Sequence, residues 1–343
     1  MNKKERIEWI DNLKAFACVL VCVGHLLQSF QKAGIDNYEN ITSYINTFIY
    51  FFHMPLFMCL SGYLYYRNKE EFSWHGYKEF VKKKFINLII PYLTFYLLYL
   101  GINIVFSNSV NTPKGIEELK GIINNPMAPY WFLYALLSIF AVIPLLEKLC
   151  KNNAKLVFSI LLILKIVSLF ISLPIYFIRS TMMYGLYFYI GAFISDKTNS
   201  SNNIFRELLL EFIYISFFSL IYYFNNTINS YLYEILKVFC AVFQIILFSS
   251  VLKKMKNLIV FDTFKKYTFQ IYVLHTIFAA GIRIVMLQIG INNYILHFSL
   301  GLLCSIYMPV LIGLISEKIV YTDFFFYPLK TIKKVKERKL SDV

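Results

Sequence analysis

Repeated apolar stretches of about twenty residues constrain this chain more than any other feature of its sequence. One of them occupies residues 13–30 and reads AFACVLVCVGHLLQSF over its main part, and similar runs recur along the chain. A helix rises about 1.5 Å per residue, so about twenty residues cross the ~30 Å hydrocarbon core of a bilayer. The composition agrees, since 58% of the residues are hydrophobic and 16% are charged, whereas a soluble protein carries about 25% charge. We therefore expect an all-α integral membrane protein.

The apolar runs predict about ten transmembrane helices, and lysine and arginine fall mainly in alternate segments between them. Cytoplasmic segments are enriched in these residues, so the alternation predicts that both termini are cytoplasmic. We expect a transmembrane domain over residues 1–330, a basic cytoplasmic tail over 331–343 and a multi-pass location in a cell membrane. The expected helices cover 12–31, 44–65, 85–106, 130–149, 155–174, 180–196, 205–225, 231–252, 268–289 and 294–320.

The formal net charge of +14 does not indicate a nucleic-acid partner. The basic residues are confined to short inter-helix segments and the tail, and no nucleic-acid-binding motif accompanies them. All six cysteines fall within or at the end of predicted helices, and none forms a C-x-x-C pair. We therefore expect neither a disulfide framework nor a metal site.

The first apolar stretch contains an ionisable stripe. Lys14 and His25 are eleven residues apart, which is about three helical turns, so they share one face roughly 16 Å apart along the axis, with Asp11 nearby. Ionisable groups inside a membrane are costly and usually face a protein interior or a wet cavity. An imidazole that titrates near neutral pH is suited to proton transfer. The alternative interpretation is that His25 packs between helices, Lys14 reaches the headgroups and Asp11 caps the helix.

The second apolar stretch, FFHMPLFMCLSGYLYY, places His53 near its outer end and a proline two residues later. His53 is either a functional imidazole or an interface residue. A proline removes one backbone hydrogen bond, so the bend it causes tends to line protein or water. The small residues Ser61 and Gly62 permit close approach of another helix.

Basic residues extend from Arg67 to the run Lys82, Lys83 and Lys84, directly before the third predicted helix. Such a cluster contacts anionic lipid or, alternatively, the phosphates of a nucleotide-like donor. The spacing alone favours the lipid interpretation.

Later aromatic and ionisable residues suggest a second functional region. Tyr130 and Trp131 begin the fourth predicted helix on the outer side, where they form either an ordinary aromatic belt or a surface that stacks on a sugar ring. His275 lies inside the ninth predicted helix, and Arg283 follows eight residues later. Both are costly enough in a membrane to need partners.

Taken together, these segments resemble the membrane-bound acyltransferase-3 family, whose members include enzymes that O-acetylate surface polysaccharides. The first two blocks are the most specific, because they include the Arg/Lys-x10-His signature as Lys14 and His25. The blocks that carry the resemblance are RIEWIDNLKAFACVLVCVGH at 6–25, FHMPLFMCLSGYL at 52–64, KKFINLIIPYL at 83–93, YWFL at 130–133 and IYVLH at 271–275.

The resemblance implies transfer of an acetyl group from cytoplasmic acetyl-CoA to a hydroxyl of a cell-surface or lipid-linked glycan. Acetyl-CoA is then a co-substrate, no cofactor is permanently bound, and a bacterial plasma membrane is the expected location. His25 would be the catalytic base. The donor would be held by Lys14, Asp11, Arg67, Lys82, Lys83 and Lys84, and the acceptor bound or the base oriented by His53, Tyr130, Trp131 and His275.

One departure from the family pattern concerns the second loop. Many members carry an Arg-x-x-Arg pair there, whereas this chain reads Arg67-Asn-Lys-Glu. Nearby lysines would then replace the missing arginine. Some members also carry an extracytoplasmic hydrolase-like domain; this sequence contains none, so we expect a stand-alone enzyme.

Alternative functions remain open at this point. The chain could be a transporter or flippase for a lipid-linked glycan, although no internal repeat supports this, or a non-catalytic membrane component of a polysaccharide assembly system. Within the acyltransferase hypothesis, a covalent acetyl-histidine intermediate and a succinyl donor are the alternatives.

Overall fold

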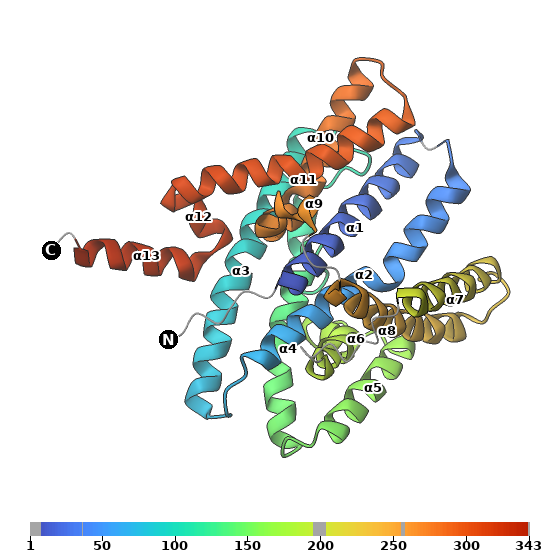
Figure 1. Cartoon of the computed structure of the whole chain (residues 1–343). Coiled ribbons are helices and arrows are strands. Elements are labelled where there is room, and N and C mark those ends of the chain that lie inside the picture. The colour runs from blue at the N-terminus through green and yellow to red at the C-terminus, as the bar shows by residue number, and fades with distance from the viewer. Residues whose placement is uncertain (1–7, 36, 195–203, 255–257, 342–343) are drawn as a thin grey trace. The chain divides into compact units, whose positions relative to one another are not determined.

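The computed structural model of the protein describes residues 8–35, 37–194, 204–254 and 258–341. Throughout this part the regular elements are helices, and no strand occurs among them, which confirms the predicted all-α class. The elements are α1 (Glu8–Ala33), α2 (Glu39–Arg67), α3 (Trp74–Val105), η1 (Ile116–Gly121), α4 (Trp131–Leu149), α5 (Ala154–Phe170), α6 (Tyr176–Ile190), η2 (Gly191–Phe193), α7 (Ile204–Tyr223), α8 (Ser230–Lys254), α9 (Ile259–Asp262), η3 (Lys265–Tyr267), α10 (Thr268–Gln288), α11 (Tyr294–Lys318), α12 (Val320–Phe326) and α13 (Pro328–Ser341) (Figure 1).

Within the described ranges, seven helices are long and apolar enough to cross a membrane by length and composition. They are α1, α2, α3, α4, α8, α10 with the preceding turn η3, and α11. The other predicted spans correspond to α5 and α6, which have 17 and 15 residues, and to α7, which carries Arg206, Glu207 and Glu211. The number of ten spans and the orientation of the termini therefore stay predictions.

The chain forms two compact units. The first unit comprises residues 1–28, 36–69 and 186–268. It holds most of α1, all of α2, the end of α6, and α7 and α8. The second unit comprises residues 29–35, 70–185 and 269–343, and so holds α3 to α5, the start of α6, and the helices from α10 onward.

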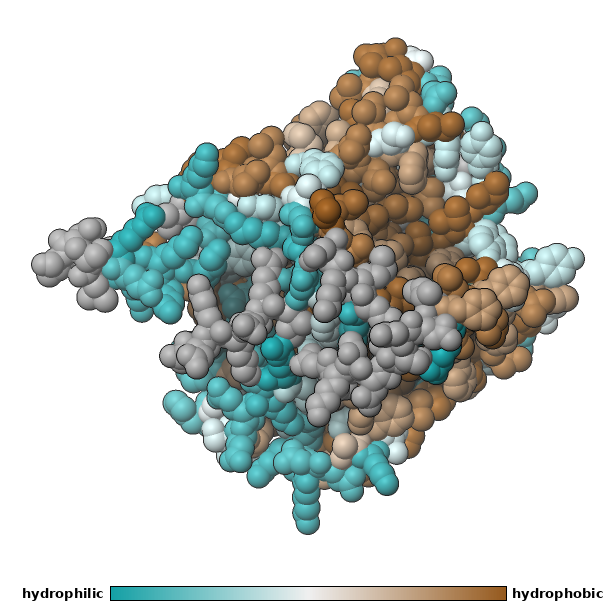
Figure 2. All heavy atoms as spheres, in the orientation of Figure 1, coloured by the Kyte–Doolittle hydropathy of each residue, from teal (hydrophilic) through white to brown (hydrophobic). Residues whose placement is uncertain are grey.

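In the first unit, α8 packs against both α2 and α7. The two glutamates of α7 are directed at α8, where Gln244 donates to Glu211 at 2.9 Å and Ser250 donates to Glu207 at 3.1 Å. The outer surface of this helix pair is apolar, as the brown area over α7 and α8 in Figure 2 shows. Polar groups turned inward and apolar groups turned outward are the arrangement a lipid environment requires.

A close helix crossing in the first unit confirms that the small residues of α2 allow another segment to approach. At Gly62 a Cβ atom would lie 1.8 Å from the carbonyl oxygen of Phe188, near the end of α6. At Gly191 a Cβ atom would lie 2.3 Å from the carbonyl oxygen of Cys59. Only glycine fits at these two positions, so the backbones of α2 and the α6–η2 segment are in direct contact.

The second unit corrects the predicted start of the third helix. The sequence predicts this helix from residue 85, but α3 begins at Trp74, and the Ser73 hydroxyl accepts a hydrogen bond from the Gly76 N–H at 3.1 Å. The apolar run marked only the part of the helix that can lie in lipid. The cap at Ser73 starts the helix three turns earlier, so its first turns carry the basic residues that were expected in a loop.

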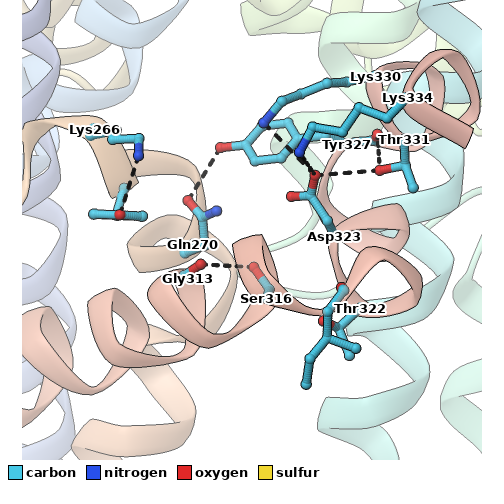
Figure 3. A network of polar contacts seen from close by, with 12 residues as sticks. Lys266, Gln270, Gly313, Ser316, Thr322, Asp323, Tyr327, Lys330, Thr331 and Lys334 are labelled. Atoms are coloured by element: carbon cyan, nitrogen blue, oxygen red, sulfur yellow. Dashed lines mark hydrogen bonds and ion pairs between the residues drawn. The ribbon is translucent and has the colours of Figure 1, made fainter. Parts of the chain in front are cut away.

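The basic tail also has a defined structure in the second unit. Its residues form α13, which is tied to α12 through Asp323, a carboxylate that is 1% exposed. Figure 3 shows Asp323 between two lysines of α13, with its Oδ2 atom 3.7 Å from Nζ of both Lys330 and Lys334. The same group of contacts continues to α10, where the Tyr327 hydroxyl donates to the Gln270 side chain at 3.2 Å. The tail is therefore packed onto the unit by buried polar contacts.

Candidate functional site

The N-terminal end of the predicted stripe is an ion pair on α1. Nζ of Lys14 lies 3.7 Å from Oδ1 of Asp11, one turn earlier on the same helix. The Lys14 side chain is 28% exposed and that of Asp11 is 14% exposed. The carboxylate thereby holds a partly accessible cation in place near the start of the helix.

His25 lies farther along α1 and is half-buried. Its ring meets the ring of Tyr50 from α2 edge to face, with centroids 6.4 Å apart and an interplanar angle of 80°. The Gln28 side chain, which follows His25 by three residues on α1, lies near the Tyr50 hydroxyl. Tyr50 of α2 therefore packs against α1 beside the imidazole.

His53 lies on the other side of Tyr50, with ring centroids 4.6 Å apart and an interplanar angle of 72°. It is 2% exposed, and its Nδ1 atom lies 2.8 Å from the carbonyl oxygen of Ile49. A carbonyl oxygen can only accept, so Nδ1 carries the proton and Nε2 of the neutral ring is the acceptor. The structure thus brings together the predicted catalytic histidine and one predicted base-orienting histidine, with a tyrosine between them.

Gly24 explains how Tyr50 comes so close to α1. A Cβ atom at Gly24 would lie 2.9 Å from Cε2 of Tyr50 and 3.5 Å from the Ile49 side chain. The buried Oδ1 atom of Asn46 lies at the same crossing, 3.7 Å from that Cβ position, and has no hydrogen-bond partner among the described residues. A polar, glycine-dependent crossing of α1 and α2 therefore lies directly beside His25.

The other predicted donor residues occupy different parts of the fold. Arg67 ends α2 in the first unit, whereas the three lysines are on the third turn of α3 in the second unit. Successive residues on a helix are about 100° apart, so the lysines do not share one face. Lys82 and Lys83 are exposed, while Nζ of Lys84 turns onto the Phe140 ring of α4, 3.9 Å from its centroid.

The second unit joins two sequence blocks that are about 140 residues apart. The hydroxyl of Tyr130 donates to the carbonyl oxygen of Val273 on α10 at 3.1 Å, and that of Tyr272 donates to the carbonyl oxygen of Pro129. The segments YWFL and IYVLH thus form one packed junction. Within it, Tyr130 and His275 are both completely buried, and Nδ1 of His275 bonds to backbone carbonyls of its own helix.

Trp131 differs from its neighbour because it borders a cavity. The Trp131 ring stacks on that of Tyr184 from α6, with centroids 5.0 Å apart and an interplanar angle of 27°. Both side chains line a cavity of about 380 Å³ between the ends of α4, α5 and α6. Of the two aromatic residues predicted to stack on a sugar, Trp131 is the one that offers an accessible surface.

Sequence reasoning missed Tyr50, Gln28 and Gly24, although they surround the His25 imidazole. The available signal was the Gly24–His25 pair itself, since a small residue beside an ionisable one on a membrane helix indicates a close helix approach at that site. It also missed Tyr184, which nothing distinguishes from the other aromatic residues of the chain.

Comparisons with known proteins identify the family of the chain. A sequence profile of the acyltransferase-3 family, described as an acyltransferase domain, matches residues 7–314. Two curated proteins called nodulation protein NolL resemble part of the chain. The one from Sinorhizobium fredii is 31% identical over 131 residues, which are 38% of this chain and 34% of the relative. The one from Mesorhizobium japonicum is 29% identical over 138 residues, 40% of this chain and 35% of the relative.

The matched region therefore spans about a third of the length of these relatives. No solved structure matches the chain significantly.

Proposed function

The chain belongs to the acyltransferase-3 family, and from that premise we propose that it is a membrane O-acyltransferase with His25 as its general base. It transfers an acetyl group from acetyl-CoA on the cytoplasmic side to a hydroxyl of a cell-surface or lipid-linked glycan, in a bacterial plasma membrane. The transporter and assembly-component alternatives lack comparable support, because the family profile covers the chain almost end to end.

The observation that carries the proposal is the His25–Tyr50–His53 group. The imidazole of His25 is half-buried and packs edge to face against Tyr50, which also packs against the ring of His53. A general base needs a defined orientation as well as a titration range near neutral pH, and the surrounding rings supply the orientation.

The proposed reaction is a direct transfer. Nitrogen of the neutral His25 ring removes the proton from the sugar hydroxyl while the hydroxyl oxygen attacks the thioester carbonyl carbon. The carbon–sulfur bond then breaks, and the imidazolium returns the proton to the departing CoA sulfur. The products are an acetyl ester and CoA with a free thiol, and His25 is again neutral. A positioned general base typically contributes about 10²- to 10⁴-fold in rate.

We assign the donor to the cytoplasmic ends of the helices. Lys14, held by Asp11, meets the phosphate groups of acetyl-CoA. Arg67, at the end of α2 in the same unit, adds positive charge. Of the lysines that would replace the missing second arginine of the family pattern, Lys82 and Lys83 of α3 are exposed, whereas the ammonium group of Lys84 lies on an aromatic ring.

The central experiment compares His25→Ala with His75→Ala in purified protein reconstituted in nanodiscs. His75 is exposed on α3, so its variant controls for loss of an imidazole elsewhere. Transfer of radiolabelled acetyl from acetyl-CoA to glycan-containing membranes of the source organism should fall at least about 100-fold in His25→Ala and stay unchanged in His75→Ala. Undiminished transfer by a folded His25→Ala variant would reject His25 as the base.

The same assay tests donor binding. Lys14→Ala should raise the KM for acetyl-CoA with a smaller effect on kcat, because it removes a contact made equally by the bound substrate and the transition state. A Lys14→Ala enzyme with an unchanged KM for the donor would remove Lys14 from the donor site. Using succinyl-CoA in parallel establishes which acyl group is transferred.

Release of CoA in the absence of acceptor distinguishes direct transfer from an acetyl-histidine intermediate. In the direct mechanism, protein mixed rapidly with acetyl-CoA and no acceptor releases no burst of free CoA thiol. A burst of about one CoA per protein that disappears in His25→Ala would instead establish the covalent route.

A further inference from the structure

The cavity beside Trp131 has no role in the reaction described so far. It is bordered by the start of α4, the end of α5 and the first turns of α6, all within the second unit. The alternating lysine and arginine pattern predicts that the linker between α5 and α6 lies on the outer side. The volume of about 380 Å³ falls within the range of small-ligand sites.

One wall of the cavity is built of stacked aromatic rings. Trp131 stacks on Tyr184, and Tyr176 stacks on Tyr134 with centroids 5.8 Å apart and an interplanar angle of 13°. The Tyr176 hydroxyl also donates to the backbone carbonyl of Trp131 at 3.5 Å. These contacts fix rigid, flat surfaces at the edge of the cavity.

Arg179 supplies a positive charge to the lining of the same cavity, one turn beyond Tyr176. The guanidinium lies 5.2 Å from the Tyr176 ring centroid, and Nη2 donates to the backbone carbonyl of Asn124 at 3.3 Å. These two contacts hold a half-buried cation in place. The hydroxyl-bearing side chains of Ser168 and Ser172 complete the polar part of the lining.

We propose that this cavity binds a sugar residue with an anionic substituent, such as a uronic acid, in the glycan acceptor. The inference rests on the proposed function for the identity of the ligand as a glycan. Flat aromatic rings fit the apolar face of a pyranose, hydroxyls match its hydroxyls, and a guanidinium pairs with a carboxylate in a bidentate manner. The aliphatic side chains of Pro126, Ile171 and Met183 complete the apolar part of the lining.

The test uses methyl β-D-glucuronide and methyl β-D-glucoside, which differ in the carboxylate alone. The chain has three tryptophans, so Trp9→Phe with Trp74→Phe leaves Trp131 as the only tryptophan reporter. In phosphatidylcholine nanodiscs, the glucuronide should change Trp131 fluorescence saturably and bind at least about tenfold more tightly than the glucoside. Calorimetric titration of the unmodified protein provides the same comparison independently of the tryptophan replacements.

Variants of the arginine separate charge from geometry. Arg179→Gln should abolish the preference for the glucuronide, and Arg179→Lys should keep part of it, because lysine retains the charge without the planar fork. Arg206→Gln serves as the matched control, since Arg206 is exposed on α7 in the first unit. Equal binding of the two glycosides, or an Arg179→Gln variant that binds like the parent, would overturn the proposal.

Two further arms test for a lipid ligand and for dependence on the proposed reaction. If phosphatidylglycerol nanodiscs alone shift Trp131 fluorescence and prevent glucuronide binding, the cavity holds a lipid headgroup and the proposal is wrong. His25→Ala should bind glucuronide normally. If the parent protein binds glucuronide normally but transfers no acetyl group, the proposed function alone is contradicted. If His25-dependent transfer occurs without glucuronide binding, this inference alone is contradicted.

Discussion

Replacing Gly62 with alanine provides the most direct test of the packing in the first unit. The added Cβ atom would lie 1.8 Å from the carbonyl oxygen and 2.7 Å from the carbonyl carbon of Phe188. Both neighbours are backbone atoms, so no side-chain rotation relieves the overlap. The segment from the end of α6 to η2 would have to move away from α2.

The required movement is large for a packed interior. Carbon and oxygen atoms in close contact are about 3.3 Å apart, so the two backbones must separate by roughly 1.5 Å. Overpacking of this kind typically costs about 1–3 kcal/mol, and the absence of a movable side chain places this variant at the upper end. Because a gap of about 0.5–1 Å already forfeits a quarter to a half of a dispersion contact, the neighbouring contacts along the crossing weaken as well.

The assay is thermal unfolding of purified protein in detergent, followed by intrinsic fluorescence. We expect the Tm of Gly62→Ala to fall by roughly 5–10 °C. Gly101→Ala in α3 and Gly281→Ala in α10 are matched controls, since a Cβ atom at either position meets nothing within 4 Å. These variants should leave Tm unchanged or raise it slightly, because alanine favours a helix by up to about 1 kcal/mol over glycine. A Gly62→Ala protein as stable as the two controls would refute the direct backbone contact.

Three further predictions follow from contacts of the same kind. Gly24→Ala should lower kcat several-fold without changing the KM for acetyl-CoA, because it displaces the Tyr50 ring beside His25; an unchanged kcat would contradict the positioning role. Asp323→Asn should destabilise the attachment of α13 by about 1 kcal/mol, since its two lysine partners are largely solvated, and hydrogen exchange of α13 should increase. Ser138→Ala removes hydrogen bonds to two hydroxyls of α6 and should lower stability by about 1 kcal/mol in the thermal assay, whereas an unaltered Tm would show that these bonds contribute little.

The helical fold could be predicted from sequence because a bilayer allows few structures. Apolar runs of sufficient length located the long helices, and the break at Pro174 separated α5 from α6. Polar helical turns were not predicted, because an apolar run marks only the part of a helix that can lie in lipid. The first turns of α3 and the whole of α13 carry many charges, so they depend on a Ser73 cap and on the buried Asp323, neither of which an apolar pattern reveals.

The candidate site was predictable to the extent that its members are costly in a membrane. His25, Lys14 and His53 stand out because ionisable groups are rare in apolar helices. Tyr50 does not, since it is one of 27 tyrosines and carries no such cost. Its importance comes from the crossing of α1 and α2 at Gly24, which is a tertiary contact.

A tertiary contact also separates the role of Trp131 from that of Tyr130, although the two residues are adjacent in the sequence pattern. Adjacent helical residues point about 100° apart, so at a helix end one can enter the core while the other faces a cavity. Tyr130 is turned toward α10 and bonds to Val273, and Trp131 is turned toward Tyr184. The side chain that meets a ligand is therefore determined by the neighbouring helix, and a sequence pattern can indicate only that one of the two does so.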